Sequence, residues 1–314
     1  MTAPRCSVIL PTHNRANTLP RAVASVLAQT MADFELIIVD DASTDGTAAL
    51  LKTLTDPRIR IARAERNQGP SAARNTGLAM ARAPVVAFLD SDDLYLPERL
   101  AVSLAVFEHE PDVICTLCSA RREDKTGQGR EVLLQAARLS APAFEWAMIC
   151  DLVGVESTSI TVSREHAAAI GGFCPALRRT EDREFLIRLA PRGALRVLPD
   201  VLFAKGWSTD GLSNDWAAAG RGLVDYVHAR PELFGRYRKL GHYFATKILV
   251  MHLRHRDLPT LLADLRRFHA AGLLAGGPVQ LWRDHSAVRR YRRAHSSAEA
   301  LAGLSGPPAD WIGE

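Results

Sequence analysis

Short apolar runs alternate with amphipathic stretches through the first half of the chain. Strands are predicted over 7–10, 34–39, 59–61, 85–89 and 113–117. Between them, apolar residues recur at helical spacing, which predicts helices over 19–27, 44–54 and 97–109 and another that follows Pro70. Strands that alternate with helices are typical of a mostly parallel sheet covered by helices. We therefore expect an α/β fold.

The pattern changes along the rest of the chain. Residues 119–142 are polar and contain glycine, so we expect a loop over the edge of the sheet. A strand near 157–162, a short helix from Arg164 and a helix from Glu181 are predicted next. From Trp216 onward the pattern is wholly helical. The expected organisation is an α/β domain over 1–212 and a helical region over 213–314.

The composition is that of a globular protein. The 314 residues are 47% hydrophobic and 24% charged, which fits about two domains and excludes a disordered chain. No apolar run approaches the roughly 18 residues of a membrane span, and the N-terminus has no secretory pattern, so a cytoplasmic location is expected. The five cysteines indicate a reducing compartment. Cys115 and Cys118 should lie on opposite faces of a strand, which favours core packing over a metal site.

Positive charge is concentrated in one stretch near the C-terminus. Residues 221–295 carry 15 Lys and Arg but 5 Asp and Glu. Such a stretch can be a solvated helical unit that packs on the first domain, or it can contact anionic lipids as a peripheral membrane surface. Nucleic-acid binding is disfavoured, because no known binding module and no spaced aromatic platform accompany the charge.

Acidic residues follow several of the predicted elements. They form the pairs 40–41 and 181–182 and the group DSDD at 90–93. In open α/β sheets ligands bind at the carboxyl ends of the strands, and crowded carboxylates repel each other unless a cation joins them. Capping of a following helix is an alternative for Asp45 and Asp93. Capping does not require carboxylates on neighbouring strand ends, so a site for Mn²⁺ or Mg²⁺ is predicted there.

Five segments resemble one known family in their order and spacing. They are SVILPTHNR (7–15), VDDASTDGT (39–47), NQGPSAARNTGLA (67–79), FLDSDD (88–93) and TED (180–182). Together they resemble the family 2 glycosyltransferases, which have the Rossmann-like GT-A fold, over residues 5 to about 212. The resemblance implies a nucleotide-sugar donor, with UDP favoured by family habit, and inversion at the anomeric carbon.

The resemblance also assigns roles to individual residues. Two groups of residues would bind the donor. The nucleobase and ribose would be held by Pro11, Thr12, Asn14, Arg15 and Asp41. The nucleotide pocket would be lined by Asn67, Gly69 and Arg74. In the DxD motif, Asp90 would face the ribose and Asp92 would ligate Mn²⁺ or Mg²⁺. Asp182 would be the catalytic base, with Glu181 as the second candidate.

The chain departs from the family pattern at one point, and the acceptor stays open. Some members supply a histidine metal ligand after the last strand, where this chain reads AKGWSTDGLSN (204–214) with Ser208 near the equivalent place. Water or diphosphate oxygens would then complete the metal shell. Trp146 and Trp207 are candidates either for stacking on sugar rings or for packing. A glycan, lipid-linked or protein acceptor is expected, in the synthesis of a polysaccharide or glycoconjugate.

Three other functions compete with this interpretation. A sugar-nucleotide-binding protein without catalysis is disfavoured by the intact Asp90, Asp92 and Asp182. A sugar-phosphate nucleotidyltransferase would carry a glycine-rich loop after the first strand, where this chain has PTHNR. A basic nucleic-acid-binding protein would show affinity for polyanions with a steep salt dependence.

Overall fold

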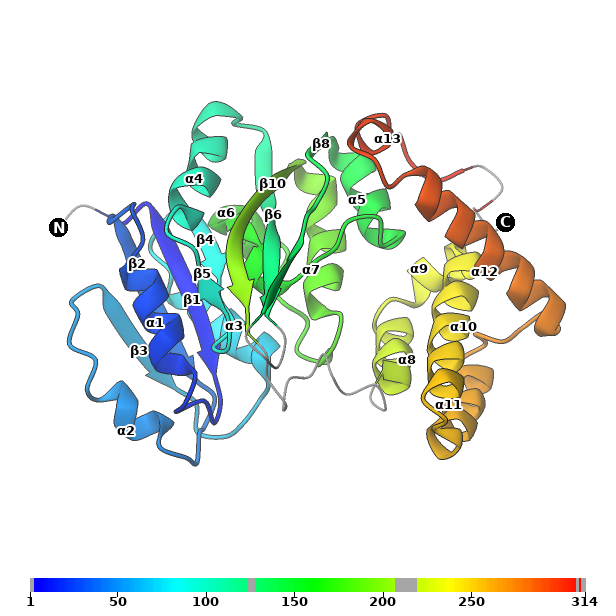
Figure 1. Ribbon diagram of the computed structural model, residues 1–314, viewed down its shortest axis with the longest axis horizontal. Coiled ribbons are helices and arrows are strands. Elements are labelled where there is room, and N and C mark those ends of the chain that lie inside the picture. The colour runs from blue at the N-terminus through cyan, green and yellow to red at the C-terminus, as the bar shows by residue number, and fades with distance from the viewer. Residues whose placement is uncertain (1–2, 124–127, 207–218, 309–310, 312–314) are drawn as a thin grey trace.

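The computed structural model describes residues 3–123, 128–206, 219–308 and 311. One sheet lies at the centre of the first two thirds of the chain, with helices on both of its faces, and further helices stand to one side of it (Figure 1). Within the described part of the chain, no helix is both long and apolar enough to cross a membrane.

Four strands form the parallel part of the sheet. They are β1 (Cys6–Thr12), β2 (Phe34–Asp40), β3 (Ile59–Arg63) and β4 (Val85–Phe88), in the order β3–β2–β1–β4. The connecting helices are α1 (Leu19–Leu27), α2 (Thr47–Leu51) and α3 (Pro70–Met80). β1, β2 and β4 are buried along their whole length, as expected of strands covered on both faces. The predicted alternation is confirmed here, and all four carboxyl ends meet at one edge.

The remainder of the sheet is mixed in direction. The order continues from β4 through β9 (Thr161–Ser163), β6 (Val113–Glu123) and β10 (Ala194–Lys205) to β5 (Leu94–Tyr95), while β7 (Gly129–Val132) pairs with β6 and β8 (Ala137–Leu139) with β10. Five of the nine pairings among the described strands are antiparallel. The α/β prediction is thus confirmed, but the sheet is mixed rather than mostly parallel. Residue periodicity reports burial and not strand direction, so the sequence could not reveal this.

The stretch 119–142 is a correction to the sequence analysis. It was expected to be a loop, but its described residues continue β6, form β7 and β8 and begin α5 (Ala141–Ile149). The side chains of Arg121, Arg122 and Arg130 are exposed on the β6–β7 ladder, so the polar pattern is that of a solvated strand pair. β10 has no counterpart among the predicted elements, because its pairing with β6 supplies order that the local pattern does not show.

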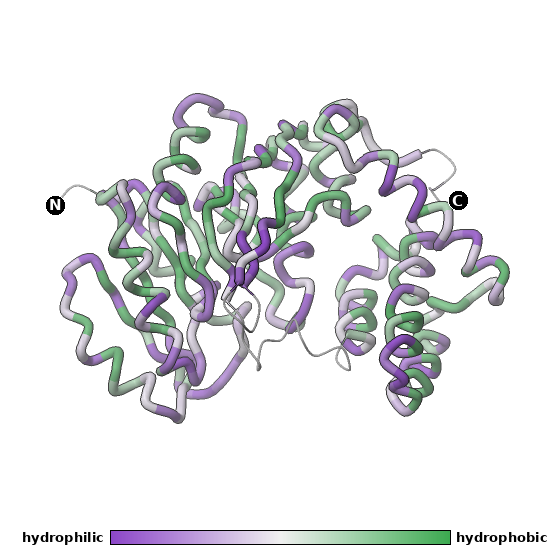
Figure 2. Tube along the Cα trace, in the orientation of Figure 1, coloured by the Kyte–Doolittle hydropathy of each residue, from purple (hydrophilic) through white to green (hydrophobic). Residues whose placement is uncertain are grey.

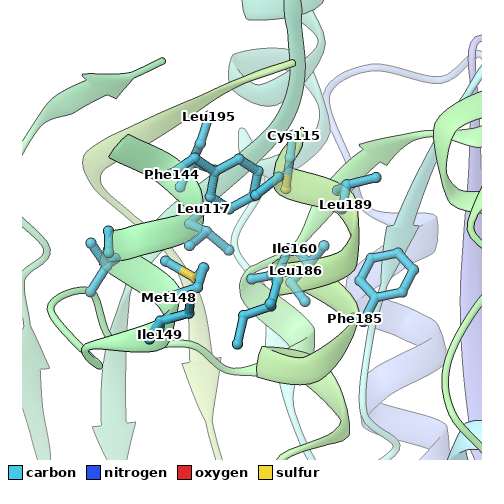
Figure 3. Packing of buried hydrophobic residues seen from close by; sticks show 14 of the residues in the cluster. Cys115, Leu117, Phe144, Met148, Ile149, Ile160, Phe185, Leu186, Leu189 and Leu195 are labelled. Atoms are coloured by element: carbon cyan, nitrogen blue, oxygen red, sulfur yellow. The ribbon is translucent and has the colours of Figure 1, made fainter. Parts of the chain in front are cut away.

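The sheet separates two hydrophobic cores. The shorter elements around it are α4 (Arg99–His109), α6 (Arg164–Ala169), α7 (Glu181–Leu189) and the 3₁₀ turns η1 (Ser157–Ser159) and η2 (Ala190–Arg192). Residues of α1 and α4 pack in one core, and residues of α3, α5 and α7 in the other. Cys115 belongs to the second core, where it lies near Phe144 (Figure 3), and Cys118 belongs to the first. The alternation predicted for these cysteines is confirmed, and both are free.

The C-terminal region is helical, as predicted. It contains α8 (Ala219–Ala229), α9 (Pro231–Arg236), α10 (Arg238–Arg254), α11 (Leu258–Ala270), α12 (Gly277–Ala294) and α13 (Ala298–Ala302). Trp146 of α5 packs against Tyr237, Tyr291 and Trp311, and its indole nitrogen donates to the Tyr291 hydroxyl at 2.9 Å. Trp146 is 1% exposed, so it packs rather than stacking on a sugar. Trp207 and the predicted boundary at 212 lie outside the described residues.

Candidate active site

The carboxyl ends of β1, β2 and β4 bring three of the predicted segments together. Thr12 at the end of β1 lies beside Asp40 at the end of β2, and the Asp41 amide donates to the Thr12 carbonyl at 2.8 Å. The Leu89 amide donates to the Ile9 carbonyl at 3.0 Å, which sets the DxD motif next to the same strand. Pro11 and Thr12 are buried at this edge. The geometry therefore gathers the N-terminal segment and both acidic groups, as strand order requires.

Asn14 and Arg15 have different surroundings. Asn14 has a φ of 52°, and its side-chain oxygen accepts from the Thr44 amide at 2.8 Å and from the Asp45 amide at 3.3 Å. Asn14 therefore holds the loop that follows β2. Arg15 influences the carboxyl group of Asp92. Burial and the Asp90 carboxylate raise the Asp92 pKa, and the positive charge of Arg15 opposes that rise. The positive charge of Arg15 thus acts on a carboxylate of the DxD motif.

Asp41 holds the loop before α3. Its two carboxylate oxygens accept from the amides of Gln68, at 2.9 Å, and Gly69, at 2.7 Å. Gly69 has a φ of 88°, a conformation that glycine adopts without strain, and it ends the loop where α3 begins. Asn67 is exposed at the same loop. The structure thus brings Asp41, Asn67 and Gly69 together, with the Asp41 carboxylate bonded to backbone.

Arg74 joins the DxD motif to the ED pair, which is Glu181 and Asp182. Its side chain is 3% exposed, and its guanidinium lies 2.7 Å from an Asp90 oxygen and 3.0 Å from a Glu181 oxygen. Burial disfavours the Arg74 charge, but the two carboxylates raise its pKa above the ordinary value. α3 can lie this close to the sheet because a Cβ at Gly77 would collide with Ile9. Arg74, predicted to line the nucleotide pocket, is an internal cation between two acidic segments.

Glu181 and Asp182 begin α7 and differ in what they contact. Glu181 is buried and paired with Arg74. Asp182 is partly exposed, and one of its oxygens accepts from the Arg183 amide at 2.7 Å. Burial, together with the neighbouring Glu181 carboxylate, raises the Asp182 pKa to about 7. Of the two candidates, Asp182 is the one whose carboxylate is not held by a cationic side chain among the described residues.

A second network, which no sequence motif indicates, links the DxD motif to the end of β10. The Asp93 carboxylate accepts from the Thr158 hydroxyl at 2.6 Å and from the Gly206 amide at 3.2 Å. Gly206 allows this approach, because a Cβ there would collide with the Asp92 carbonyl. Asp93 therefore has a structural role other than the helix cap considered for it.

Lys205 is the cation of that network. Its ammonium lies 2.9 Å from a Glu156 oxygen. Burial opposes the charge of Lys205, but Glu156 and Asp93 raise its pKa above the ordinary value. The signal in the sequence is the apolar run VLFAK, which ends in this lysine, but no strand is predicted over it.

The described residues offer few metal ligands. They contain no group of three or more His, Cys, Asp and Glu side chains that could hold a metal ion. Asp90 is paired with Arg74 and Asp93 is bonded to Thr158 and Gly206, which leaves Asp92 as the DxD carboxylate without a side-chain partner among these residues. Ser208 lies outside the described residues.

Comparison with known proteins agrees with this geometry. Residues 7–162 match the model of glycosyl transferase family 2. The succinoglycan biosynthesis protein ExoO of Rhizobium meliloti is 43% identical over 97 residues, which are 31% of this chain and 28% of that protein. The UDP-Glc:alpha-D-GlcNAc-diphosphoundecaprenol beta-1,3-glucosyltransferase WfgD of Escherichia coli is 37% identical over 100 residues, 32% of this chain and 40% of that protein. The matches span less than half the length of either relative.

The fold also matches solved structures. The mannosyltransferase PcManGT from Pyrobaculum calidifontis, solved in complex with GDP-Man and Mn²⁺, superposes with a TM-score of 0.60 over 96% of this chain and 86% of that chain. The two sequences are 22% identical, so this likeness establishes the GT-A fold alone.

Proposed function

The chain carries a glycosyl transferase family 2 domain in residues 7–162, and from this premise we propose that it transfers a sugar, with inversion, from a nucleoside diphosphate to an acceptor hydroxyl. One observation carries the proposal: buried Arg74 contacts both Asp90 of the DxD motif and Glu181 of the ED pair. The bridge sets a donor-binding segment and a proton acceptor side by side. A transferase needs both at one reacting carbon.

The donor site is proposed at the edge formed by β1, β2 and β4. Pro11, Thr12, Asn14, Arg15 and Asp41 would hold the nucleobase and ribose, with Asn67, Gly69 and Asp90 at the margin of the pocket. Arg74 would act through Asp90 rather than by touching the donor, because its guanidinium is buried. A UDP-sugar is the proposed donor, supported by the UDP-Glc in the name of the Escherichia coli relative.

A divalent cation fits this site through Asp92. A single partly exposed carboxylate among hard oxygen donors suits Mn²⁺ or Mg²⁺, provided that the diphosphate and water supply the other ligands. Burial and the Asp90 carboxylate raise the Asp92 pKa, and the charges of Arg15 and Lys205 offset only part of that rise. When bound, the ion would neutralise charge on the departing diphosphate.

The proposed reaction is a single displacement at the anomeric carbon. The acceptor oxygen forms a bond to that carbon while the bond to the diphosphate oxygen breaks, and the electron pair leaves with the nucleoside diphosphate. Asp182 accepts the proton of the acceptor hydroxyl. Arg74 contacts Glu181, and the neighbouring Glu181 carboxylate is one of the causes that raise the Asp182 pKa. Lys205 and Arg15 place positive charge near Asp92, where the diphosphate would lie.

The acceptor is proposed to be a hydroxyl of a growing glycan, lipid-linked or attached to protein, in polysaccharide or glycoconjugate synthesis. Two relatives support this: the name of one refers to succinoglycan biosynthesis, and the name of the other to a sugar on a lipid diphosphate.

Nucleotide binding tests the donor site directly. UDP with Mn²⁺ should raise the unfolding midpoint of the protein, because a ligand at 100 times its dissociation constant adds about 2.7 kcal/mol to stability. GDP, TDP and CMP serve as alternatives, each with and without metal. Asp92→Ala should lose the metal-dependent part, whereas Asp33→Ala, at an exposed carboxylate outside the site, should behave as the parent does.

Either of two results would contradict that expectation. Stabilisation that is equal with and without metal would remove Asp92 from the proposed role. Failure of every nucleotide to stabilise the parent protein would overturn the transferase proposal and favour a polyanion-binding protein.

The pH dependence of transfer tests the base. We expect kcat/KM to rise with pH through about 7, because Asp182 accepts a proton only in its ionised form and its pKa is raised to about 7. Glu181→Gln removes one cause of the raised pKa, so the midpoint of the profile should move to lower pH. A profile whose midpoint does not move would show that Glu181 does not control the catalytic carboxylate.

A further inference from the structure

Large exposed apolar side chains are concentrated in the C-terminal helices. The described residues include eight of them, and six lie between 250 and 282: Val250, Leu253, Leu258, Leu262, Val279 and Trp282. The first four flank the connection between α10 and α11 and are 38–58% exposed. We call these four, together with the exposed Arg254, Arg256 and Arg266, the basic tip.

The inner faces of α10 and α11 are already packed against each other and against α8. His252 and Asp264 are buried and lie 3.0 Å apart between the two helices. A Cβ at Gly220 of α8 would collide with Asp264, so α8 covers that side of α11. The Asp257 amide donates to the His252 carbonyl at 3.0 Å, and the Asp257 side chain caps α11, which closes the turn tightly. Leu253, Leu258 and Leu262 are therefore left facing solvent by the packing itself.

The charged side chains that belong to the tip are all arginines. Arg254, Arg256 and Arg266 form no ion pair with any described residue, and each is exposed. Two acidic residues lie nearby: Asp264 is buried and paired with Arg267, and Asp257 caps α11 with a side chain that is 35% exposed, so arginines outnumber exposed carboxylates here. Figure 2 shows hydrophobic and hydrophilic turns side by side at this end of α10 and α11. The surface is thus both apolar and cationic.

The tip faces the same side of the molecule as the candidate active site. In Figure 1 the arrowheads of β1 and β10 and the α10–α11 connection all point to the lower edge of the view. A flat surface that touches the tip would therefore lie on the side from which the strand ends are reached.

We propose that the basic tip docks on an anionic lipid membrane. Three unpaired arginines attract anionic headgroups, at about 1 kcal/mol each or about fivefold in affinity, and leucines at the same place enter the headgroup region. The tip itself has no aromatic residue for stacking on bases, so a lipid surface suits it better than a nucleic acid. The proposal is independent of sugar transfer, because docking needs neither donor nor acceptor.

Vesicle sedimentation of the full chain, without nucleotide, tests the proposal. Vesicles of phosphatidylcholine mixed with phosphatidylglycerol should bind the protein, and vesicles of phosphatidylcholine alone should not. R254Q/R256Q/R266Q should weaken binding about 100-fold. R21Q/R82Q/R192Q makes the same change in charge at exposed arginines of the α/β domain and should bind as the parent does. L253N/L262N should lose the part of the binding that resists high salt, since salt screens only the charges.

Three results would overturn the proposal. The first is absence of binding to the mixed vesicles, and the second is equal binding by the two arginine variants. The third is binding to DNA of equal strength and equal dependence on the tip arginines, which would make the surface a general polyanion site. Matching unfolding midpoints of all variants would exclude misfolding as the cause of any loss.

Discussion

Asp182→Asn should lower the rate of the proposed transfer by about 10²- to 10⁴-fold, the usual contribution of a general base. Asparagine keeps the shape of the side chain and can still accept from the Arg183 amide, but it cannot take the acceptor proton. Stabilisation by nucleotide and metal should persist, because Asp182 is not proposed to touch the donor. The measurement is kcat with saturating donor beside the nucleotide-dependent unfolding midpoint.

Asp200→Asn is the matched control for this change. Asp200 is exposed on β10, and its replacement should leave kcat near that of the parent. A fully active Asp182→Asn protein would exclude Asp182 as the base. A parent protein that binds nucleotide and metal but transfers no sugar would favour the non-catalytic binding protein.

Arg74→Met should lower the free energy of unfolding by about 3 kcal/mol or more, because it leaves buried charge without a partner. Glu181 is buried and its side chain is 12% exposed, so it would lose its cation with little compensation from water. The Asp90 side chain is 30% exposed, so it can recover some hydration. The expected loss of unfolding free energy is therefore at the lower end of the range measured when one partner of a buried ion pair is removed. Urea unfolding measures the change.

Two further variants separate charge from packing at this position. The Phe173 ring centroid lies 5.3 Å from the guanidinium carbon of Arg74, and an unbranched methionine should keep apolar packing against this ring. If the loss of stability comes from the unpaired charge, then adding Glu181→Gln to Arg74→Met should restore part of it, because this change removes the buried carboxylate that has lost its cation. Arg66→Met, at an exposed arginine on the loop before α3, should change stability by less than about 0.5 kcal/mol. A loss of that small size for Arg74→Met would show that the bridge is not stabilising.

The bridge also gives Arg74 a functional consequence. It connects α3, the DxD motif and α7, so a displacement of Asp90 would be felt at Glu181 and hence in the Asp182 pKa. Arg74 is accordingly a positioning residue for the proposed reaction, and Arg74→Met should alter the pH profile as well as the stability.

The sequence by itself determined the elements whose pattern is local. Buried strands such as 34–39 and 85–89 reveal themselves by continuous apolar runs, and each ends in carboxylates that strand order then gathers at one edge. The resemblance of the five segments predicted the GT-A fold and the candidate residues, and three of the segments lie at the ends of β1, β2 and β4. Periodicity also sufficed to separate Cys115 from Cys118.

Tertiary structure alone decided the features that depend on distant partners. Arg74 and Glu181 are 107 positions apart, and only packing shows that their pairing leaves Asp182 without a cationic partner among the described residues. β10 and its Lys205 are ordered by β6, and the exposure of the basic tip depends on which helix faces α8 and the His252–Asp264 pair occupy. The physical reason is that residue type and spacing encode burial, whereas strand direction, ion-pair partners and solvent exposure arise from contacts between segments that the local pattern does not specify.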